Sequence, residues 1–268
     1  MREYDQPAPQ RDRWGRPLLG GNAFTRASTL AKVLDDQSNL IAWKARTTAL
    51  GLAKSPDLIA LASTASPDDR KKLNELVSKA CDRAGGDSGR DLGTAIHSVS
   101  EILDYGRSTE GIPADLLADG RAYQEKCRAF GLMPLCGEMF VAHRRLKVAG
   151  SFDRLLMDSS GATFIADIKT GKAGETADYK AKYNALAWSI QLAVYAHSTP
   201  WFDGWKSWSK LDLTPPDKTR GIVFHIPRGT GTCNVIEVDL AEGIEAAKVA
   251  VKVQRLRKIN LSIVRGAA

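Results

Sequence analysis

Two aspartates and a lysine in the second half of the chain are spaced so that they can share one site. Asp153 ends the sequence Gly150-Ser-Phe-Asp153, and Asp167-Ile-Lys169 follows across a predicted hairpin. Alternate residues of a strand share a face, so Asp167 and Lys169 project together while Ile168 points into the core. Converging carboxylates repel each other unless a cation lies between them, and hard oxygen ligands suit Mg²⁺ or Mn²⁺. Lys169 would then orient a water or stabilise charge that develops on phosphorus.

A plainer interpretation of this pattern is a solvated ion pair. Asp and Lys two positions apart on an exposed strand face are common, and such a pair contributes under about 1 kcal/mol. The neighbouring Phe164-Ile165-Ala166 and Ile168 are apolar, however, so the charged residues interrupt a strand that otherwise favours burial. Charges in such a strand need a reason, which favours the site.

The composition is that of a soluble globular protein with an excess of basic side chains. At 268 residues, 43% hydrophobic and 26% charged, the chain can form one large domain but not two independent enzymes. The formal net charge of +7 favours a polyanionic partner, since basic side chains placed against phosphates release counterions. No run approaches the roughly 18 to 20 apolar residues of a membrane span, and the polar start does not resemble a signal peptide. We expect a cytoplasmic protein without a membrane partner.

The cysteines are isolated from one another. They are Cys81, Cys127, Cys136 and Cys233, and no two approach the CxxC spacing of a compact metal site. We therefore expect reduced thiols rather than an iron–sulfur cluster.

The first third of the chain is predicted to be helical. Residues 1–25 carry prolines, glycines and charges without periodicity, which indicates a flexible arm. Apolar residues recur every three or four positions over 28–36, 39–50 and 67–83, which predicts amphipathic helices. We expect a helical N-terminal region over 26–87 and a core domain over 88–268.

The hydrophobic period in the core domain changes from helical to strand-like and back. Helices are expected over 91–103, 113–130, 178–197 and 241–258. Strands are expected over 138–144, 147–157, 162–169, 221–226 and 234–238, with Asp158-Ser-Ser-Gly161 as a hairpin turn. This order predicts an α/β (α+β) fold, in which helices flank a mixed sheet.

Four short motifs in this region resemble a known family. They are Gly93-Thr-Ala-Ile-His97, Gly150-Ser-Phe-Asp153, Asp167-Ile-Lys-Thr-Gly171 and Gln191-Leu-Ala-Val-Tyr195. Their order and spacing are similar to the GxxxH, GxxD, (D/E)xK and QxxxY motifs of RecB-type PD-(D/E)XK nucleases. That branch includes CRISPR-associated spacer-acquisition nucleases and many phage exonucleases, with lambda exonuclease a more distant relative. The resemblance covers about residues 90–195 and implies a restriction-endonuclease-like fold.

The resemblance implies a role for each matched residue. Asp153 and Asp167 would bind Mg²⁺ or Mn²⁺, together with His97 and the backbone carbonyl of Ile168. Lys169 would orient the attacking water or stabilise charge. Gln191 and Tyr195, four residues apart and so on one helical face, would steady the site and touch the DNA backbone. Glu138 resembles a frequent acidic position of the family, and a surface role for it is equally compatible with the sequence.

The resemblance further implies a metal-dependent DNA exonuclease that hydrolyses phosphodiester bonds from DNA ends in phage recombination or replication. It would act in the host cytoplasm, and a single-strand annealing protein is a further partner; no oligomeric state is predicted. A non-catalytic nucleic-acid-binding module is disfavoured because every motif residue is present. A spacer-acquisition nuclease is disfavoured because only Cys233 lies late in the chain, where that subgroup has three cysteines. A sequence-specific endonuclease would need a readout element, and none is recognisable.

Basic and aromatic residues around the motifs have two interpretations. The basic ones could follow DNA phosphates or form solvated faces, and they are His143, Arg144, Arg145, Lys147, Arg154, Lys172, Lys180, Lys182, Lys248, Lys252, Arg255, Arg257 and Lys258. The helical spacing of Trp201, Trp205 and Trp208 favours helix core or partner-facing surface over base stacking. His143, His197 and His225 match no motif, so we expect them to be structural or exposed.

Overall fold

The computed structural model describes the backbone of residues 1–85 and 88–258 and the side chains of residues 1–85 and 92–258. The described helices are α1 (Ala27–Ala31), α2 (Ser38–Ala53), α3 (Pro56–Ser63), α4 (Arg70–Arg83), α5 (Ser88–Asp104), α6 (Ala114–Ala129), α7 (Ala177–Ala196), α8 (Leu240–Leu256) and the 3-10 helix η1 (Trp208–Leu211). The strands are β1 (Leu18–Leu19), β2 (Asn22–Ala23), β3 (Thr25–Arg26), β4 (Met133–Gly137), β5 (Phe140–His143), β6 (Val148–Ser151), β7 (Arg154–Met157), β8 (Thr163–Gly171), β9 (Thr199–Pro200), β10 (Arg220–Pro227) and β11 (Asn234–Asp239). No described helix is both long and apolar enough to cross a lipid bilayer.

Contacts group the chain into two compact units. One unit is Asp36–Ala95, and the other joins Met1–Asp35 to the chain from Ile96 onward. The sequence-based division into an arm (1–25), a helical region (26–87) and a core (88–268) places its boundaries elsewhere and stays a prediction. In the structure, part of the expected arm pairs with the core, because the Gln6 side chain donates to the Phe140 carbonyl at 2.7 Å and accepts from the Phe140 N–H at 2.6 Å.

The smaller unit is a helical hairpin closed by a short third helix. Leu58, Leu76 and Ala80 form its buried centre. Gly51 on α2 lies so close to the Ala80 carbonyl on α4 that a Cβ at this position would clash with the backbone. Helix α3 was not expected from the hydrophobic pattern. It begins at Pro56, a residue whose fixed φ and missing N–H suit the first helical position.

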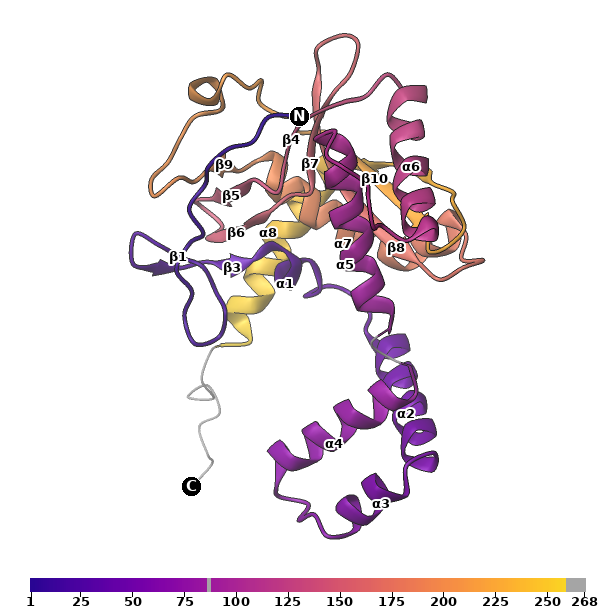
Figure 1. The fold of residues 1–268 in the computed structure, drawn as a ribbon. Coiled ribbons are helices and arrows are strands. Elements are labelled where there is room, and N and C mark those ends of the chain that lie inside the picture. Colours follow the sequence, from indigo (N-terminus) through magenta and orange to yellow (C-terminus); the bar gives the residue numbers. More distant parts are fainter. Residues whose placement is uncertain (86–87, 259–268) are drawn as a thin grey trace, which may run out of the picture. The chain divides into compact units, whose positions relative to one another are not determined.

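The larger unit is built on a mixed sheet with strand order β11-β10-β8-β7-β4, in which only β8 and β10 run parallel (Figure 1). One face packs against α7 and α8, with Ile165 and Val223 in the shared core. The other face packs against α5 and α6 through Ala166, Ile168 and Phe224. The expected mixed sheet between helices is therefore confirmed, and β8 is its central strand.

The larger unit contains a second sheet, of four strands. Its order is β3-β6-β5-β9, with β3 and β6 parallel and the other pairs antiparallel. Two short connections join the two sheets directly, Glu138–Met139 between β4 and β5 and Phe152–Asp153 between β6 and β7, and we call them crossings. The crossings are hydrogen-bonded to each other, since the Glu138 N–H donates to the Asp153 carbonyl at 3.2 Å and the Phe152 N–H to the Met139 carbonyl at 3.3 Å.

These crossings correct two sequence-based expectations. The expected strand over 147–157 is interrupted at Phe152–Asp153, and the expected strand over 138–144 begins only after the first crossing. The hydrophobic pattern continues through both breaks because Phe152 and Met139 are buried in the core between the sheets. Glu138 makes its turn with a φ of 52°, which is unusual for a residue other than glycine.

The helix predicted for the tryptophan segment is also wrong. Trp208 stacks on Phe152 in the core, while Trp201 and Trp205 pack edge to face.

Candidate active site

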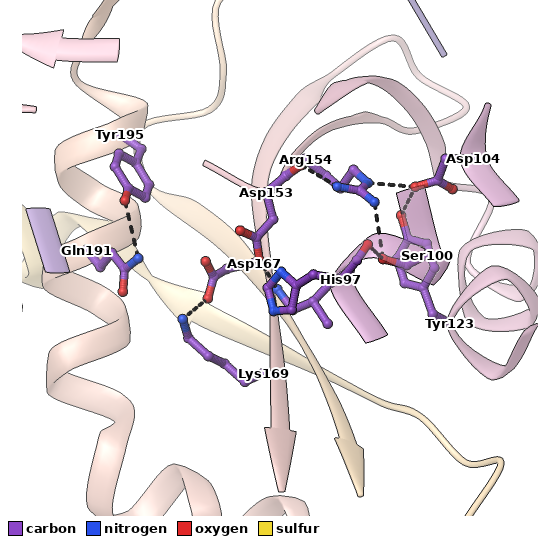
Figure 2. Close-up of polar contacts among 11 residues, drawn as sticks. His97, Ser100, Asp104, Tyr123, Asp153, Arg154, Asp167, Lys169, Gln191 and Tyr195 are labelled. Atoms are coloured by element: carbon purple, nitrogen blue, oxygen red, sulfur yellow. Dashed lines mark hydrogen bonds and ion pairs between the residues drawn. The ribbon is translucent and has the colours of Figure 1, made fainter. Parts of the chain in front are cut away.

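Asp153 lies at the crossing between the sheets and is fixed by the neighbouring strand. Its residue is 9% exposed, and its carboxylate Oδ2 accepts a hydrogen bond from the Ile168 N–H at 2.7 Å. The β7–β8 register pairs Arg154 with Ala166, which brings Asp153 opposite Asp167 as the sequence predicted. The Ile168 side chain points to the opposite face, where it is buried against α5 and α6. Figure 2 shows both carboxylates turned toward the same space.

Asp167 and Lys169 form an ion pair on one face of β8. Burial and the nearby charge of Asp153 raise the pKa of Asp167 to about 6, although Lys169 acts in the opposite direction. Burial lowers the pKa of Lys169, but the two aspartates outweigh this effect and the net shift is upward. The buried Oδ2 of Asp167 has no partner among the described residues apart from the Lys169 ammonium.

His97 approaches the carboxylates from helix α5. Its Nδ1 lies 3.4 Å from Asp153 Oδ2, and its side chain is 31% exposed. Burial lowers the pKa of His97, although the charge of Asp167 and the Ile168 backbone act against it. At neutral pH the imidazole is therefore largely neutral, which is the form that coordinates metals. The Ile168 backbone therefore contacts both Asp153 and His97. Its N–H donates to Asp153, and the backbone also lies beside the His97 ring.

The donor atoms gathered here fit a divalent cation. One ligand atom each from His97, Glu138 and Asp153 lies within 4.8 Å of the others, the one such group within the described residues. Asp167 lies beside this group in Figure 2, and its Oδ2, which only the Lys169 ammonium contacts, is a further candidate ligand atom. Carboxylate oxygens and one imidazole suit Mg²⁺ or Mn²⁺. Glu138, whose role the sequence left open, is the exposed member of this group.

A buried network behind the site was missed by the sequence analysis. Arg154, for which the sequence allowed either phosphate contact or a solvated face, is 1% exposed and pairs with Asp104 at 2.6 Å. Its other nitrogens donate to the Asp153 carbonyl at 2.7 Å and to Ser100 Oγ at 3.2 Å. Ser100 Oγ in turn donates to the His97 carbonyl at 2.8 Å. This network, drawn in Figure 2, connects the backbones of two candidate ligands and is completed by Tyr123, which donates to Asp104 at 3.1 Å.

Helix α7 presents Gln191 and Tyr195 toward the site. The Gln191 amide donates to the Tyr195 hydroxyl at 3.3 Å. Burial first, and the charge of Asp167 next, raise the pKa of Tyr195, so its hydroxyl keeps its proton. A Cβ on Gly150 would lie 3.0 Å from this hydroxyl, so the glycine makes room for the ring. Gln191 and Tyr195 also line a cavity of about 270 Å³, together with Arg11 and Arg26.

The remaining histidines and the cysteines lie outside this group. His225 stands beside Lys169 on the neighbouring parallel strand and is fully buried. Neither of its ring nitrogens has a hydrogen-bond partner among the described residues. His143 and His197 are partly buried, and burial lowers the pKa of both. The four cysteines are buried and unpaired.

Comparison with known proteins gives one family. A family model described as the PD-(D/E)XK nuclease superfamily matches residues 63–198, half of the chain. No curated protein matches the chain. Among the solved structures that match, one described as "Crystal structure of SSO0001" is 14% identical, covers 66% of this chain and 81% of its own, and has a TM-score of 0.27.

The raised pKa of Asp167 predicts a stability effect of Asp167→Asn without metal. A proton bound more tightly in the folded state stabilises it below the unfolded pKa, near 4, and this contribution disappears as pH rises through about 6. In EDTA at pH 7.5 we expect the unfolding free energy of Asp167→Asn to be about 1 to 3 kcal/mol higher than that of the parent. The difference should shrink at pH 4.5, and Mg²⁺ or Mn²⁺ should stabilise the parent more than the variant. Exposed Asp68→Asn is the control, and a variant less stable than the parent at pH 7.5 would contradict the prediction.

The Arg154 network predicts a large loss of stability when the guanidinium is removed. Arg154→Met leaves the buried Asp104 carboxylate unpaired, which should lower the urea unfolding free energy by about 3 to 5 kcal/mol. Removing both charges in Arg154→Met/Asp104→Leu should restore part of that loss. The control is Lys248→Ala, which removes an exposed ion pair with Glu245 and should cost less than about 1 kcal/mol. Equal midpoints for Arg154→Met and the parent would show that the network does not support the fold.

Proposed function

The chain belongs to the PD-(D/E)XK nuclease superfamily, and we propose that it is a metal-dependent DNA exonuclease of phage recombination or replication. The observation that carries the proposal is the convergence of His97, Asp153, Asp167 and Lys169 at the crossing between the sheets. Members of this superfamily are nucleases that use divalent metals. Nucleic acid is therefore the substrate class, and the choice of DNA and of its ends belongs to the proposal.

The acidic residues of this site would hold the cation. When bound, Mg²⁺ or Mn²⁺ would polarise a phosphoryl oxygen and lower the pKa of a water molecule. Asp153 offers the oxygen that Ile168 does not use, because only its Oδ2 accepts the backbone hydrogen bond. His97 offers a neutral ring nitrogen, Glu138 an exposed carboxylate and Asp167 the oxygen that only the Lys169 ammonium contacts. We assign the Ile168 carbonyl to the same group, as the motif resemblance implies.

The other motif residues would act on the phosphate directly. Lys169 is held charged by Asp167, so its ammonium can orient a water or stabilise charge on the phosphoryl oxygens. The Tyr195 hydroxyl accepts from Gln191 and keeps its own proton, so it can donate to a phosphate oxygen. Gln191 therefore sets the direction in which the tyrosine donates. The reaction is hydrolysis of a phosphodiester bond by water.

DNA as substrate is supported by charge. The net charge of +7 and the arginines at the cavity beside Gln191 favour a polyanion that is held mainly through its phosphates. A cytoplasmic location fits four unpaired cysteines. A single-strand annealing protein remains the partner that the phage resemblance suggests.

Substitution at Lys169 and Asp153 tests the catalytic assignment. Lys169→Ala should lower single-turnover DNA cleavage roughly 100-fold, since a preorganised charge aimed at the transition state contributes a few kcal/mol. Asp153→Asn or excess EDTA should abolish cleavage, whereas DNA affinity should change little. Lys172→Ala, an exposed lysine of the following loop, is the matched control. Cleavage that persists in EDTA, or in Asp153→Asn, is incompatible with the proposed site.

The exonuclease assignment predicts a dependence on DNA ends. With Mg²⁺ or Mn²⁺, linear DNA should be shortened progressively, while covalently closed circles should survive at the same enzyme concentration. Labels at the 5′ and the 3′ end, followed on a denaturing gel, measure this directly. Circles linearised beforehand with a restriction enzyme supply the control. Discrete fragments, or nicking of supercoiled circles at a comparable rate, would indicate an endonuclease instead.

A further inference from the structure

A second pocket of the larger unit lies outside the residues assigned to catalysis. It has a volume of about 440 Å³ and is formed by the N-terminal segment, the β3–α1 connection and the end of α8. Its lining includes Trp14, Arg16, Arg26, Gln254, Arg257 and Lys258. Four of these side chains are cationic and none of the lining residues is acidic. Such a pocket favours an anionic ligand.

Three of the four cations are available to that ligand. Arg16 is neutralised by Asp12, with Nε donating to the carboxylate at 2.7 Å. Arg26, Arg257 and Lys258 are exposed and form no ion pair with an acidic side chain among the described residues. Three like charges around one cavity repel each other, and phosphate groups would relieve this repulsion.

The aromatic residue of the pocket, Trp14, has the Arg13 guanidinium over its ring at 4.0 Å and the Arg16 guanidinium at 4.9 Å, so a flat ligand would stack on the indole by taking the place of one of them. Trp14 is 61% exposed, the second-highest exposed fraction among the large hydrophobic residues described. The Asp12 carboxylate accepts hydrogen bonds from the Trp14 N–H at 3.0 Å and from the Arg16 N–H at 2.9 Å, which fixes the turn that carries the ring. An exposed indole beside cations is the combination that binds unpaired bases and their phosphates.

The pocket lies next to the cavity beside Gln191 and Tyr195. Arg26 lines both, and its strand β3 pairs with β6 so that Arg26 lies opposite Ala149. The next residue, Gly150, lines the active-site cavity beside Gln191 and Tyr195. A polynucleotide strand that passes the catalytic residues can therefore follow Arg26 into the second pocket.

We propose that this pocket binds a single-stranded DNA segment beyond the cleaved bond, with a base stacked on Trp14 and phosphates held by Arg26, Arg257 and Lys258. The inference rests on the proposed DNA nuclease function and deepens it. Stacking on an indole requires an open base face, which an unpaired nucleotide offers and the interior of a duplex does not. The ligand class is therefore single-stranded DNA next to the active site.

The test measures binding in an Asp167→Asn background, in which the DNA stays intact. Fluorescence anisotropy follows a labelled 20-nucleotide oligo-dT and a blunt-ended hairpin duplex. Trp14→Ala should weaken oligo-dT binding roughly 10-fold, and Trp14→Phe should restore most of the affinity. Arg257→Ala/Lys258→Ala should also weaken it and reduce the salt dependence, by about 0.7 in logarithmic slope for each phosphate that is no longer neutralised. Lys248→Ala/Lys252→Ala, which removes two charges from the same helix outside the pocket, should have a smaller effect.

Three outcomes would overturn the proposal. Oligo-dT affinity unchanged in Trp14→Ala and in Arg257→Ala/Lys258→Ala would exclude the pocket as a binding site. An equal loss for the hairpin duplex would indicate a general phosphate surface, without selection for unpaired bases. A control pair as harmful as Arg257→Ala/Lys258→Ala would indicate net charge alone. Failure of the nuclease function is distinguishable, because it would appear as absent DNA cleavage by the chain without substitutions.

Discussion

The electrostatic repulsion between two buried carboxylates is the constraint on which the site depends. Asp153 and Asp167 face each other across the β7–β8 pair, and burial raises the pKa of both. The chain offsets this cost with the Lys169 ammonium and the Ile168 N–H. A cation would offset the remainder, since a carboxylate oxygen of Asp167 keeps unused acceptor capacity. The two carboxylates therefore destabilise the unliganded site, and binding of a cation would relieve this destabilisation.

The alternation of strand residues made part of this site predictable. It placed Asp167 and Lys169 on one face, and the turn at Asp158–Gly161 brought Asp153 beside them. The same reasoning could not find the crossings between sheets, because Phe152 and Met139 are apolar like strand residues and are buried as strand residues would be. Hydrophobic periodicity reports burial, and it does not report which sheet a buried residue belongs to.

Long-range pairing was the other part that the sequence could not provide. Arg154 has the residue type of a surface cation and stands in a basic stretch, so nothing local indicates that it is buried against Asp104. These two residues are far apart in the chain, and only the fold brings α5 behind β7. The helix predicted for the tryptophans was wrong for a related reason. Helical spacing is only one of several patterns that place a tryptophan in a core, and here Trp208 reaches the core from a 3-10 helix. Helices α6, α7 and α8 were predicted to within two residues, since no proline interrupts any of them over 16 to 20 residues.

The position of Glu138 and Asp153 between two sheets limits how this chain can change length. An insertion of one residue in β6 or β7 would reverse the faces of the strand and separate the carboxylate from Ile168. The hairpin ends at 144–147 and 158–162 lie away from the crossings, and apart from the hydrogen bond that the Lys147 carbonyl accepts from the Thr25 N–H they form only local turn hydrogen bonds. Insertions and deletions in descendants of this sequence should therefore accumulate at these turns, while the segments between each turn and its crossing keep a fixed residue count.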